Sequence, residues 1–231
     1  MREDTSQNAE KYLSLALQKQ SEKAISFLDE LADSKKLSLM DLCDILVAAQ
    51  QQTSCAPKGV ITFADEHYRS DVTLRAIDTL SKKFSPSRGK EGGSALVANL
   101  LQREHHTVGI KMFAAILKAN GWKVDFVASP LDVTSFFKRI EKSSEKFNLI
   151  CFTVTMEFNV EELARILKTL RTNANTRDAI IVVGSRLFSA KSFIDKMTDK
   201  ETGRPLADFI AKDFTEGLKF IRDNKTLQRR N

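Results

Sequence analysis

The sequence has little cysteine, and the spacing of its cysteines excludes a class of metal site. The three residues, Cys43, Cys55 and Cys151, lie far apart and form no paired spacing. This pattern argues against a zinc site, whose cysteine and histidine ligands recur at short intervals. It also favours a reducing compartment, because disulfide-stabilised secreted proteins carry paired cysteines.

Long apolar runs are missing as well. No stretch approaches the roughly 20 residues that a membrane-spanning helix needs. The N-terminal segment MREDTSQNAEKYL is polar and lacks the apolar core of a signal peptide. The chain has neither an internal repeat nor a low-complexity segment. We therefore expect a cytoplasmic protein that does not enter a membrane.

The composition is that of an ordinary globular protein. The 231 residues provide enough length for one large domain or two small ones. The net charge of +6 is spread along the chain, with a modest cluster in the C-terminal KFIRDNKTLQRRN. Such a charge permits weak association with nucleic acid, but a solvated surface is its commoner explanation.

Residues 6–84 carry helical patterns throughout. AEKYLSLALQ and EKAISFLDELA have apolar residues at three- and four-residue intervals. Ser38, with Asp41 three residues later, is a capping-box-like start of a third helix. A fourth helix is expected from Ile61 to Phe84, after the break SCAPKG. Four helices with short loops predict a four-helix bundle over residues 1–91.

After the linker SPSRGKEGGS (85–94), apolar runs and helical patterns alternate. Strands are expected at 95–101, 123–128, 149–154 and 179–184, with a weaker fifth at 207–211. Helices are expected near residues 115, 137, 165 and 193 and after Asp213. This alternation predicts an α/β fold, a Rossmann-like doubly wound parallel sheet, over residues 92–231.

Ligands of such sheets bind outside the carboxyl ends of the strands. Three of the predicted strands end in residues with useful chemistry, namely Glu104–His106, Thr153–Thr155 and Gly184–Ser185. These strand ends are therefore the candidate ligand site.

The first strand end has the pattern Glu104-x-His106-x-x-Gly109. A histidine in a polar loop is commonly only solvated. Glu104 lies two residues before His106, where its carboxylate can accept a hydrogen bond from one ring nitrogen. That contact fixes the tautomer and makes the other nitrogen a better metal ligand. Gly109, at the start of the next helix, would let the backbone approach a bulky ligand.

These strand ends resemble the cobalamin-binding module of methionine synthase, methylmalonyl-CoA mutase and their relatives. The family pattern is D/E-x-H-x-x-G, then S-x-L or S-x-T, then G-G; this sequence has EHHTVG, TVT and VGSRLF. The resemblance implies base-off cobalamin, in its adenosyl, methyl or hydroxo form, with His106 as the lower ligand of cobalt. It also implies a slot for the nucleotide tail beside Thr153, Thr155 and Gly184. Ser185 replaces the second family glycine.

The helical part resembles the cap of CarH-type light-dependent repressors and related cobalamin photoreceptors. Their pattern W-x-x-G-x-I-x-V-x-x-E-H is matched in register by Gly59, Ile61, Phe63, Glu66 and His67. A glutamate at position 104, in place of aspartate, also favours this subgroup. In the family the glutamate–histidine pair packs over the upper axial face of the corrin, which implies that role for Glu66 and His67.

Two positions depart from the photoreceptor pattern. The tryptophan that shields the upper ligand falls on Ala56, and the histidine that captures cobalt after photolysis falls on Pro57. Proline cannot bind cobalt, so a photochemical cycle that ends in a bis-histidine adduct is not available unchanged. No winged-helix or helix-turn-helix segment precedes the bundle. We therefore expect no DNA-binding domain in this chain, and a regulatory output through a partner protein or a homo-oligomer.

Simpler roles are open for several of these residues. His105 is expected to be solvated, and Glu66 and His67 can be bundle-surface residues. Thr153 and Thr155 can serve packing alone. Core positions are expected for the remaining conspicuous side chains, Trp122, Phe136, Phe137 and Cys151.

Three functions are compatible with the sequence. The first is a stand-alone, non-catalytic cobalamin-binding sensor that responds to ligand state or light, which Glu104, Glu66 and His67 favour. The second, from the enzyme class, is a corrinoid methyl-carrier subunit of a methyltransferase system. The third is a degenerate module that binds haem or no cofactor and acts as a scaffold, which Ala56, Pro57 and Ser185 leave open.

Overall fold

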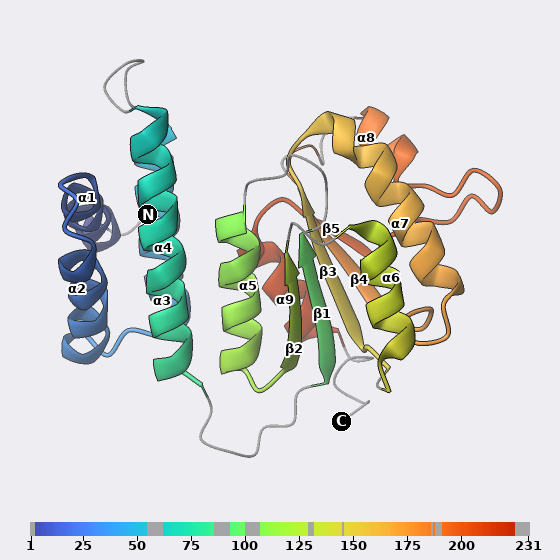
Figure 1. The fold of residues 1–231 in the computed structure, drawn as a ribbon, viewed down its shortest axis with the longest axis horizontal. Coiled ribbons are helices and arrows are strands. Elements are labelled where there is room, and N and C mark those ends of the chain that lie inside the picture. Colours follow the sequence, from blue (N-terminus) through green and yellow to red (C-terminus); the bar gives the residue numbers. More distant parts are fainter. Residues whose placement is uncertain are drawn as a thin grey trace. The chain divides into compact units, whose positions relative to one another are not determined.

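The computed structural model describes residues 3–54, 62–85, 93–99, 107–128, 132–144, 146–185, 187 and 191–224. The chain divides into two compact units, a helical unit (Met1–Ser87) and a sheet unit (Arg88–Asn231) (Figure 1). The predicted domain boundary after residue 91 stays a prediction, because residues 86–92 lie outside the described part of the chain.

The helical unit confirms the predicted order of helices. Its described segments form α1 (Glu3–Leu17), α2 (Ser21–Ser34), α3 (Leu39–Ser54) and α4 (Phe63–Lys83). The capping box expected at the start of α3 is present. The backbone N–H of Ser38 donates to Asp41 Oδ2 at 2.9 Å, and the backbone N–H of Asp41 donates to Ser38 Oγ at 3.2 Å.

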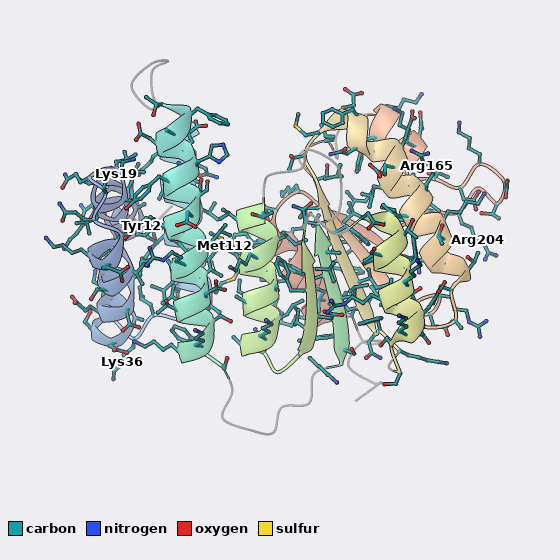
Figure 2. All side chains as sticks on the ribbon, viewed as in Figure 1. Tyr12, Lys19, Lys36, Met112, Arg165 and Arg204 are labelled. Carbon is teal, nitrogen blue, oxygen red and sulfur yellow. The ribbon has the colours of Figure 1, made fainter. Side chains whose placement is uncertain are left out.

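A buried polar contact lies within the apolar core of the helical unit. The Tyr12 side chain, labelled in Figure 2, is fully buried together with Leu28, Leu42, Leu46 and Leu80. Thr73 Oγ1 donates to the backbone carbonyl of Arg69 at 2.9 Å, so the Tyr12 hydroxyl, 3.0 Å from Thr73 Oγ1, is the donor of that pair. Burial raises the pKa of Tyr12 to about 12, because the phenolate would lose its hydration.

The sheet unit confirms the predicted doubly wound α/β fold. Its strands are β1 (Ser94–Asn99), β2 (Lys123–Ala128), β3 (Leu149–Val154), β4 (Ile180–Ser185) and β5 (Phe209–Ala211). All are parallel, in the order β2-β1-β3-β4-β5. The chain order reverses between β1 and β3, and at such a reversal the carboxyl ends of the strands border a ligand crevice.

Helices cover both faces of this sheet (Figure 1). They are α5 (Thr107–Ala119), α6 (Val133–Lys142), the short 3-10 helix η1 (Glu157–Asn159), α7 (Val160–Thr172), α8 (Lys191–Lys196) and α9 (Phe214–Asp223). Alternate residues of β3 separate the two cores: Leu149 and Cys151 pack with α5 and α9, whereas Ile150 and Phe152 pack with α6, α7 and α8.

Two of the four expected core residues, Phe136 and Cys151, are buried. Phe137 and Trp122 are half-buried and pack against the cores on the two faces of the sheet. Burial of Cys151 also raises the pKa of its thiol well above the usual range, so the thiolate is suppressed. In the described segments, no helix combines the length and the apolar character needed to cross a membrane.

Candidate functional site

The carboxyl ends of β3 and β4 bring together two of the predicted site residues. Thr153 and Gly184 are paired in register on adjacent parallel strands. Their side-chain positions follow those of Leu149, Cys151 and Val182, so both face the α5 and α9 side of the sheet. Asn99, the buried last residue of β1, follows Val97 on that same side.

Because Gly184 has no side chain, it leaves space beside Thr153 that the side chain of any other residue would fill. A Cβ atom added at this position would lie 3.3 Å from Thr153 Cγ2, which is tighter than nine in ten Cβ contacts in proteins. Thr153 Oγ1 is buried and, among the described residues, has no hydrogen-bond partner. An unpaired buried hydroxyl costs about 1–3 kcal/mol, which a ligand with a polar group can recover. This pair therefore has both the space and the chemistry for a slender, partly polar ligand segment.

Ser185, also expected among the cofactor residues, has its side chain on the other face of the sheet from Thr153 and Gly184, and its role at the cofactor stays a prediction. It pairs in register with Val154, a member of the core under α6 and α7. Its hydroxyl accepts a hydrogen bond from the backbone N–H of Leu187 at 2.9 Å. The serine in place of the second family glycine therefore does not fill the space beside Thr153 and Gly184.

Two further predicted residues lie in segments that follow strands of the sheet, Thr155 after β3 and Gly109 in α5, which follows β1. Thr155 is half-buried and follows directly after β3. Gly109 is the third residue of α5, and a Cβ atom added there would meet nothing within 4 Å. The start of α5 thus leaves space for a bulky group beside its backbone.

The predicted cobalt ligand cannot be located. Glu104, His105 and His106 lie outside the described residues, and the described chain resumes at Thr107, the first residue of α5. Ala56, Pro57 and Gly59 also lie outside them. Within the described segments, no group of three or more histidine, cysteine, aspartate or glutamate side chains is arranged to hold a metal ion. The roles of Glu104 and His106 stay predictions.

Glu66 and His67 belong to the helical unit, in the first two turns of α4. The His67 ring lies edge-on to the Phe63 ring, with 4.2 Å between their centroids. The role of both residues above the corrin stays a prediction.

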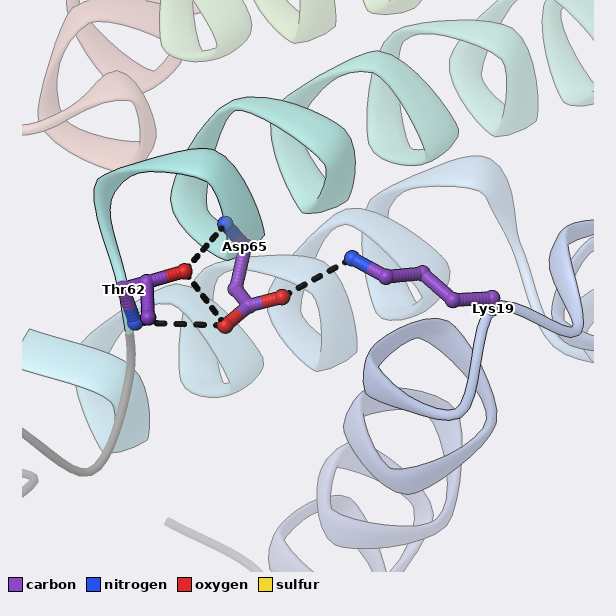
Figure 3. Close-up of polar contacts among 3 residues, drawn as sticks. All are labelled: Lys19, Thr62 and Asp65. Carbon is purple, nitrogen blue, oxygen red and sulfur yellow. Dashed lines mark hydrogen bonds and ion pairs between the residues drawn. The ribbon is translucent and has the colours of Figure 1, made fainter.

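The start of α4 is held by a set of polar contacts drawn in Figure 3. Thr62 and Asp65 form a capping box, and Lys19 Nζ lies 2.8 Å from Asp65 Oδ1. The hydrogen bonds from Lys19 and Thr62 lower the pKa of Asp65 to about 2. Lys19 Nζ also lies 4.3 Å from the centre of the Tyr68 ring. Sequence patterns did not indicate Lys19, which contacts α4 across 46 positions of the chain and has a positive φ of 61°.

The turn after β3 holds further residues that the sequence did not single out. Met156 and Phe158 are exposed, and Asn159 between Phe158 and α7 is buried. In the sequence, the methionine and phenylalanine of TMEFNV look like core residues. Only the fold shows that their side chains are exposed.

A comparison with protein families finds one match, which lies in the sheet unit. Residues 94–196 match the B12 binding domain. The match begins at the first residue of β1 and ends at the last residue of α8, so it contains the Thr153 and Gly184 pair. The cofactor of this B12 binding domain is cobalamin, as the strand ends indicated.

Three solved structures are similar to this chain. The monomethylamine corrinoid protein of Methanosarcina barkeri is 15% identical, with a TM-score of 0.65, over 90% of this chain and 94% of that chain. A cobalamin-binding protein from Desulfitobacterium hafniense is 13% identical, with a TM-score of 0.46, over 91% of this chain and 97% of that one. The methanol:cobalamin methyltransferase complex of M. barkeri is also 13% identical with a TM-score of 0.46, over 100% and 85%.

The first of these structures confirms the fold, a parallel α/β sheet preceded by a helical bundle, because the match extends over both units. The search of the curated proteins finds no match. The resemblance of the helical unit to photoreceptor caps stays a prediction.

Proposed function

We propose that this chain is a corrinoid carrier, which holds cobalamin base-off and presents it to a methyltransferase partner. The observation that carries the proposal is the match to the B12 binding domain over residues 94–196. This segment contains the space beside Gly184 and the Thr153 hydroxyl, which has no hydrogen-bond partner in the described part of the chain. Bound cobalamin supplies a cobalt atom that accepts and releases a methyl group. The protein supplies binding, orientation and shielding of that cofactor.

Each residue of the site has a definite part in this proposal. His106 binds cobalt from below, and Glu104 accepts a hydrogen bond from its second ring nitrogen. Gly109 lets the start of α5 approach the ring. Thr153 and Gly184 receive the nucleotide tail on the α5 and α9 side of the sheet, and Thr155 borders the opening.

The carrier role has the support of the fold over the whole chain. The monomethylamine corrinoid protein shares both the helical bundle and the sheet with this chain. A light- or ligand-dependent sensor is the second candidate. The Glu66 and His67 pair favours it, because both residues match the cap pattern of the cobalamin photoreceptors.

Cobinamide provides the sharpest test of the cobalt ligand. It keeps the corrin ring but lacks the benzimidazole, so a nitrogen ligand on its cobalt must come from the protein. We expect the protein to bind cobinamide with the absorption and electron-spin-resonance spectra of a nitrogen-ligated cobalt, and His106→Ala to abolish those features. His105→Ala, its neighbour, is the matched control and should leave them intact. Binding of cobinamide by the wild-type protein without nitrogen ligation would contradict the assignment.

Light separates the carrier from the sensor. The protein loaded with adenosyl- or methylcobalamin is compared in the dark and after illumination by analytical ultracentrifugation. A carrier should sediment with the same mass in both states, whereas a sensor should change its oligomeric state or release a bound partner.

A further inference from the structure

The sheet unit has a six-residue strand, β2, at one edge of its parallel sheet. The backbone N–H of Lys123 donates to the Gly93 carbonyl at 3.2 Å, so Lys123 and every second residue after it direct their backbone groups to β1. The backbone groups of Val124 and Phe126 therefore point out of the sheet edge. Among the described residues, none outside the strand forms a hydrogen bond with them. This edge can therefore accept a further strand.

The opposite edge of the sheet is less open. β5 has three residues, whereas β2 has six, and the backbone N–H of Lys212 after β5 donates to Glu216 Oε2 at 2.8 Å. Proteins commonly shorten or cover their edge strands, because a free edge pairs readily with another chain. Within the described part of the sheet, β2 is thus the edge whose length and outward backbone groups suit strand addition.

The side chains of this edge divide into an apolar and a charged face. Trp122, Val124 and Phe126 lie on the α5 and α9 side of the sheet, where all three are half-buried. Lys123 and Asp125 alternate with them and lie on the opposite side, where Lys123 is exposed and Asp125 is half-buried. A partner strand must therefore offer apolar groups on one face and matching charges on the other.

The strand is complementary to a second copy of itself. About a two-fold axis at Val124, two copies of β2 run antiparallel, with the two Val124 residues opposite each other. Lys123 then lies opposite Asp125 of the second copy, and Trp122 lies opposite Phe126 of the second copy. The symmetry makes each of these pairs occur twice. Opposite charges and aromatic pairs placed directly across two strands stabilise their pairing.

Charge selects this register over its neighbours. An axis at Lys123 would place two lysines opposite each other, and an axis at Asp125 would place two aspartates opposite each other. An axis at Phe126 would place Asp125 opposite the apolar Val127. Like charges directly opposite each other destabilise a strand pair. Of these four axes, the one at Val124 alone joins opposite charges.

The Asp125 carboxylate is already held in place for such a contact. Arg139 of α6 donates to it from Nε at 3.0 Å and from Nη2 at 2.6 Å, with one hydrogen bond to each carboxylate oxygen. This bidentate contact fixes the carboxylate beside β2. Each oxygen has a second lone pair, so the lysine ammonium of another copy can bind without displacing Arg139.

We propose that the β2 edge is a homodimer interface, in which two copies of the chain pair antiparallel about Val124. The outward backbone groups of Val124 bond to those of the second copy, and the two sheets become one continuous sheet. Lys123 and Asp125 form two ion pairs across the axis, and Trp122 and Phe126 form two contacts on the opposite face. The dimer requires no cobalamin, so the inference goes beyond the proposed function and is tested separately from it.

The single tryptophan of the chain reports on this interface. In the dimer Trp122 packs against Phe126 of the second copy and loses contact with water, so its emission should move to shorter wavelength as the protein concentration rises. Sedimentation equilibrium of the ligand-free full chain measures the mass over the same range. We expect the mass to rise from that of one 26.0 kDa chain to that of two.

Two variants test the pairing, with a matched control. Lys123→Glu places a glutamate opposite Asp125 of the second copy and should weaken dimerisation by about tenfold or more. Val124→Pro removes the central outward N–H and should weaken dimerisation at least as much. Edge strands tolerate proline where the N–H faces outward, so this variant should still unfold cooperatively. Lys219→Glu makes the same change of charge at an exposed position of α9 and should dimerise like the wild-type protein.

The inference is overturned if the wild-type protein stays monomeric at every concentration. It is also overturned if Lys123→Glu dimerises as tightly as the wild-type protein, because the dimer then forms through another surface. An equal loss of dimerisation in Lys219→Glu has the same meaning, since net charge rather than the β2 edge would then control association. If Val124→Pro does not unfold cooperatively, Lys123→Glu decides alone.

Discussion

Single residues at the end of β4 illustrate how finely the cofactor site depends on strand parity. Gly184 faces the α5 and α9 side, where a side chain would meet Thr153, whereas Ser185 faces the opposite core. Gly184 and Ser185, which are adjacent in the sequence, therefore have different structural roles. Gly184 keeps space free beside Thr153, and the Ser185 hydroxyl binds the backbone of Leu187.

Gly184→Val should distinguish the tail site from the ring site. The added side chain would crowd Thr153 Cγ2, so we expect cobalamin to bind about tenfold more weakly, equivalent to about 1.4 kcal/mol. Cobinamide lacks the nucleotide tail and should bind as it does to the wild-type protein. Both affinities are measured by absorbance titration.

Ser185→Ala is the control for this experiment, because its side chain lies on the opposite face. It should leave the affinities for cobalamin and cobinamide unchanged. An equal loss of both ligands in Gly184→Val would indicate a distorted sheet rather than a blocked tail site.

The positions of whole helices and strands depend on contacts between residues that lie far apart in the sequence. The first turn of α4 combines a local capping box with the ion pair between Asp65 and Lys19. The edge strand β5 is held in a comparable way. Arg171 of α7 binds the Asp208 carboxylate at 2.7 Å, and that carboxylate accepts the backbone N–H of Ile181 in β4 at 2.7 Å.

The stabilising contacts of Asp65 at the start of α4 should persist at acidic pH until the pH approaches about 2. The pKa of Asp65 is lowered from 3.8 to about 2 in the folded protein, so its contribution to stability is complete above pH 3.8. The contribution is lost as the pH falls through about 2, where the folded carboxylate is protonated. Asp65→Asn should therefore be less stable than the wild-type protein at neutral pH, and the difference should vanish towards pH 2. Urea unfolding over a pH series measures this difference.

Asp71→Asn is a matched control on the same helix, since Asp71 lies outside the capping box. Its difference from the wild-type protein should be smaller at neutral pH than that of Asp65→Asn. A difference for Asp65→Asn that stays constant between neutral pH and pH 2 would contradict the assignment.

The whole molecule consists of two units, each with its own buried core. The match to the B12 binding domain begins at residue 94 and lies entirely within the sheet unit. The residues that we assign to the lower ligand, the tail and the approach to the ring therefore all belong to this unit, whereas Glu66 and His67 belong to the other.

The sheet unit should fold and bind the corrin by itself. A chain of residues 88–231 retains both cores of the sheet, so we expect one cooperative thermal transition. It should also bind cobinamide with the nitrogen-ligated spectrum of the full chain. Circular dichroism and absorbance titration measure the two properties. A folded fragment that cannot ligate cobinamide would show that the helical unit contributes directly to binding.

The sequence by itself determined the order and type of the elements. Apolar residues at three- and four-residue intervals indicated the helices, and short continuous apolar runs indicated the strands, because strands of a parallel sheet are buried on both faces. The strands predicted at 123–128 and 149–154 have those bounds in the structure. The glycine, hydroxyl and histidine pattern at the strand ends also indicated cobalamin, which the family match confirms.

Only the tertiary structure decided which of these side chains share a surface. Thr153 and Gly184 are neighbours because β3 and β4 pair in parallel register, and Ser185 is not, because its parity is opposite. The same holds for Lys19, which meets Asp65 through the packing of the bundle, and for Asn159, which is buried in the fold. Periodicity depends on neighbours along the chain, whereas register, burial and long-range ion pairs depend on elements that meet only when the chain has folded.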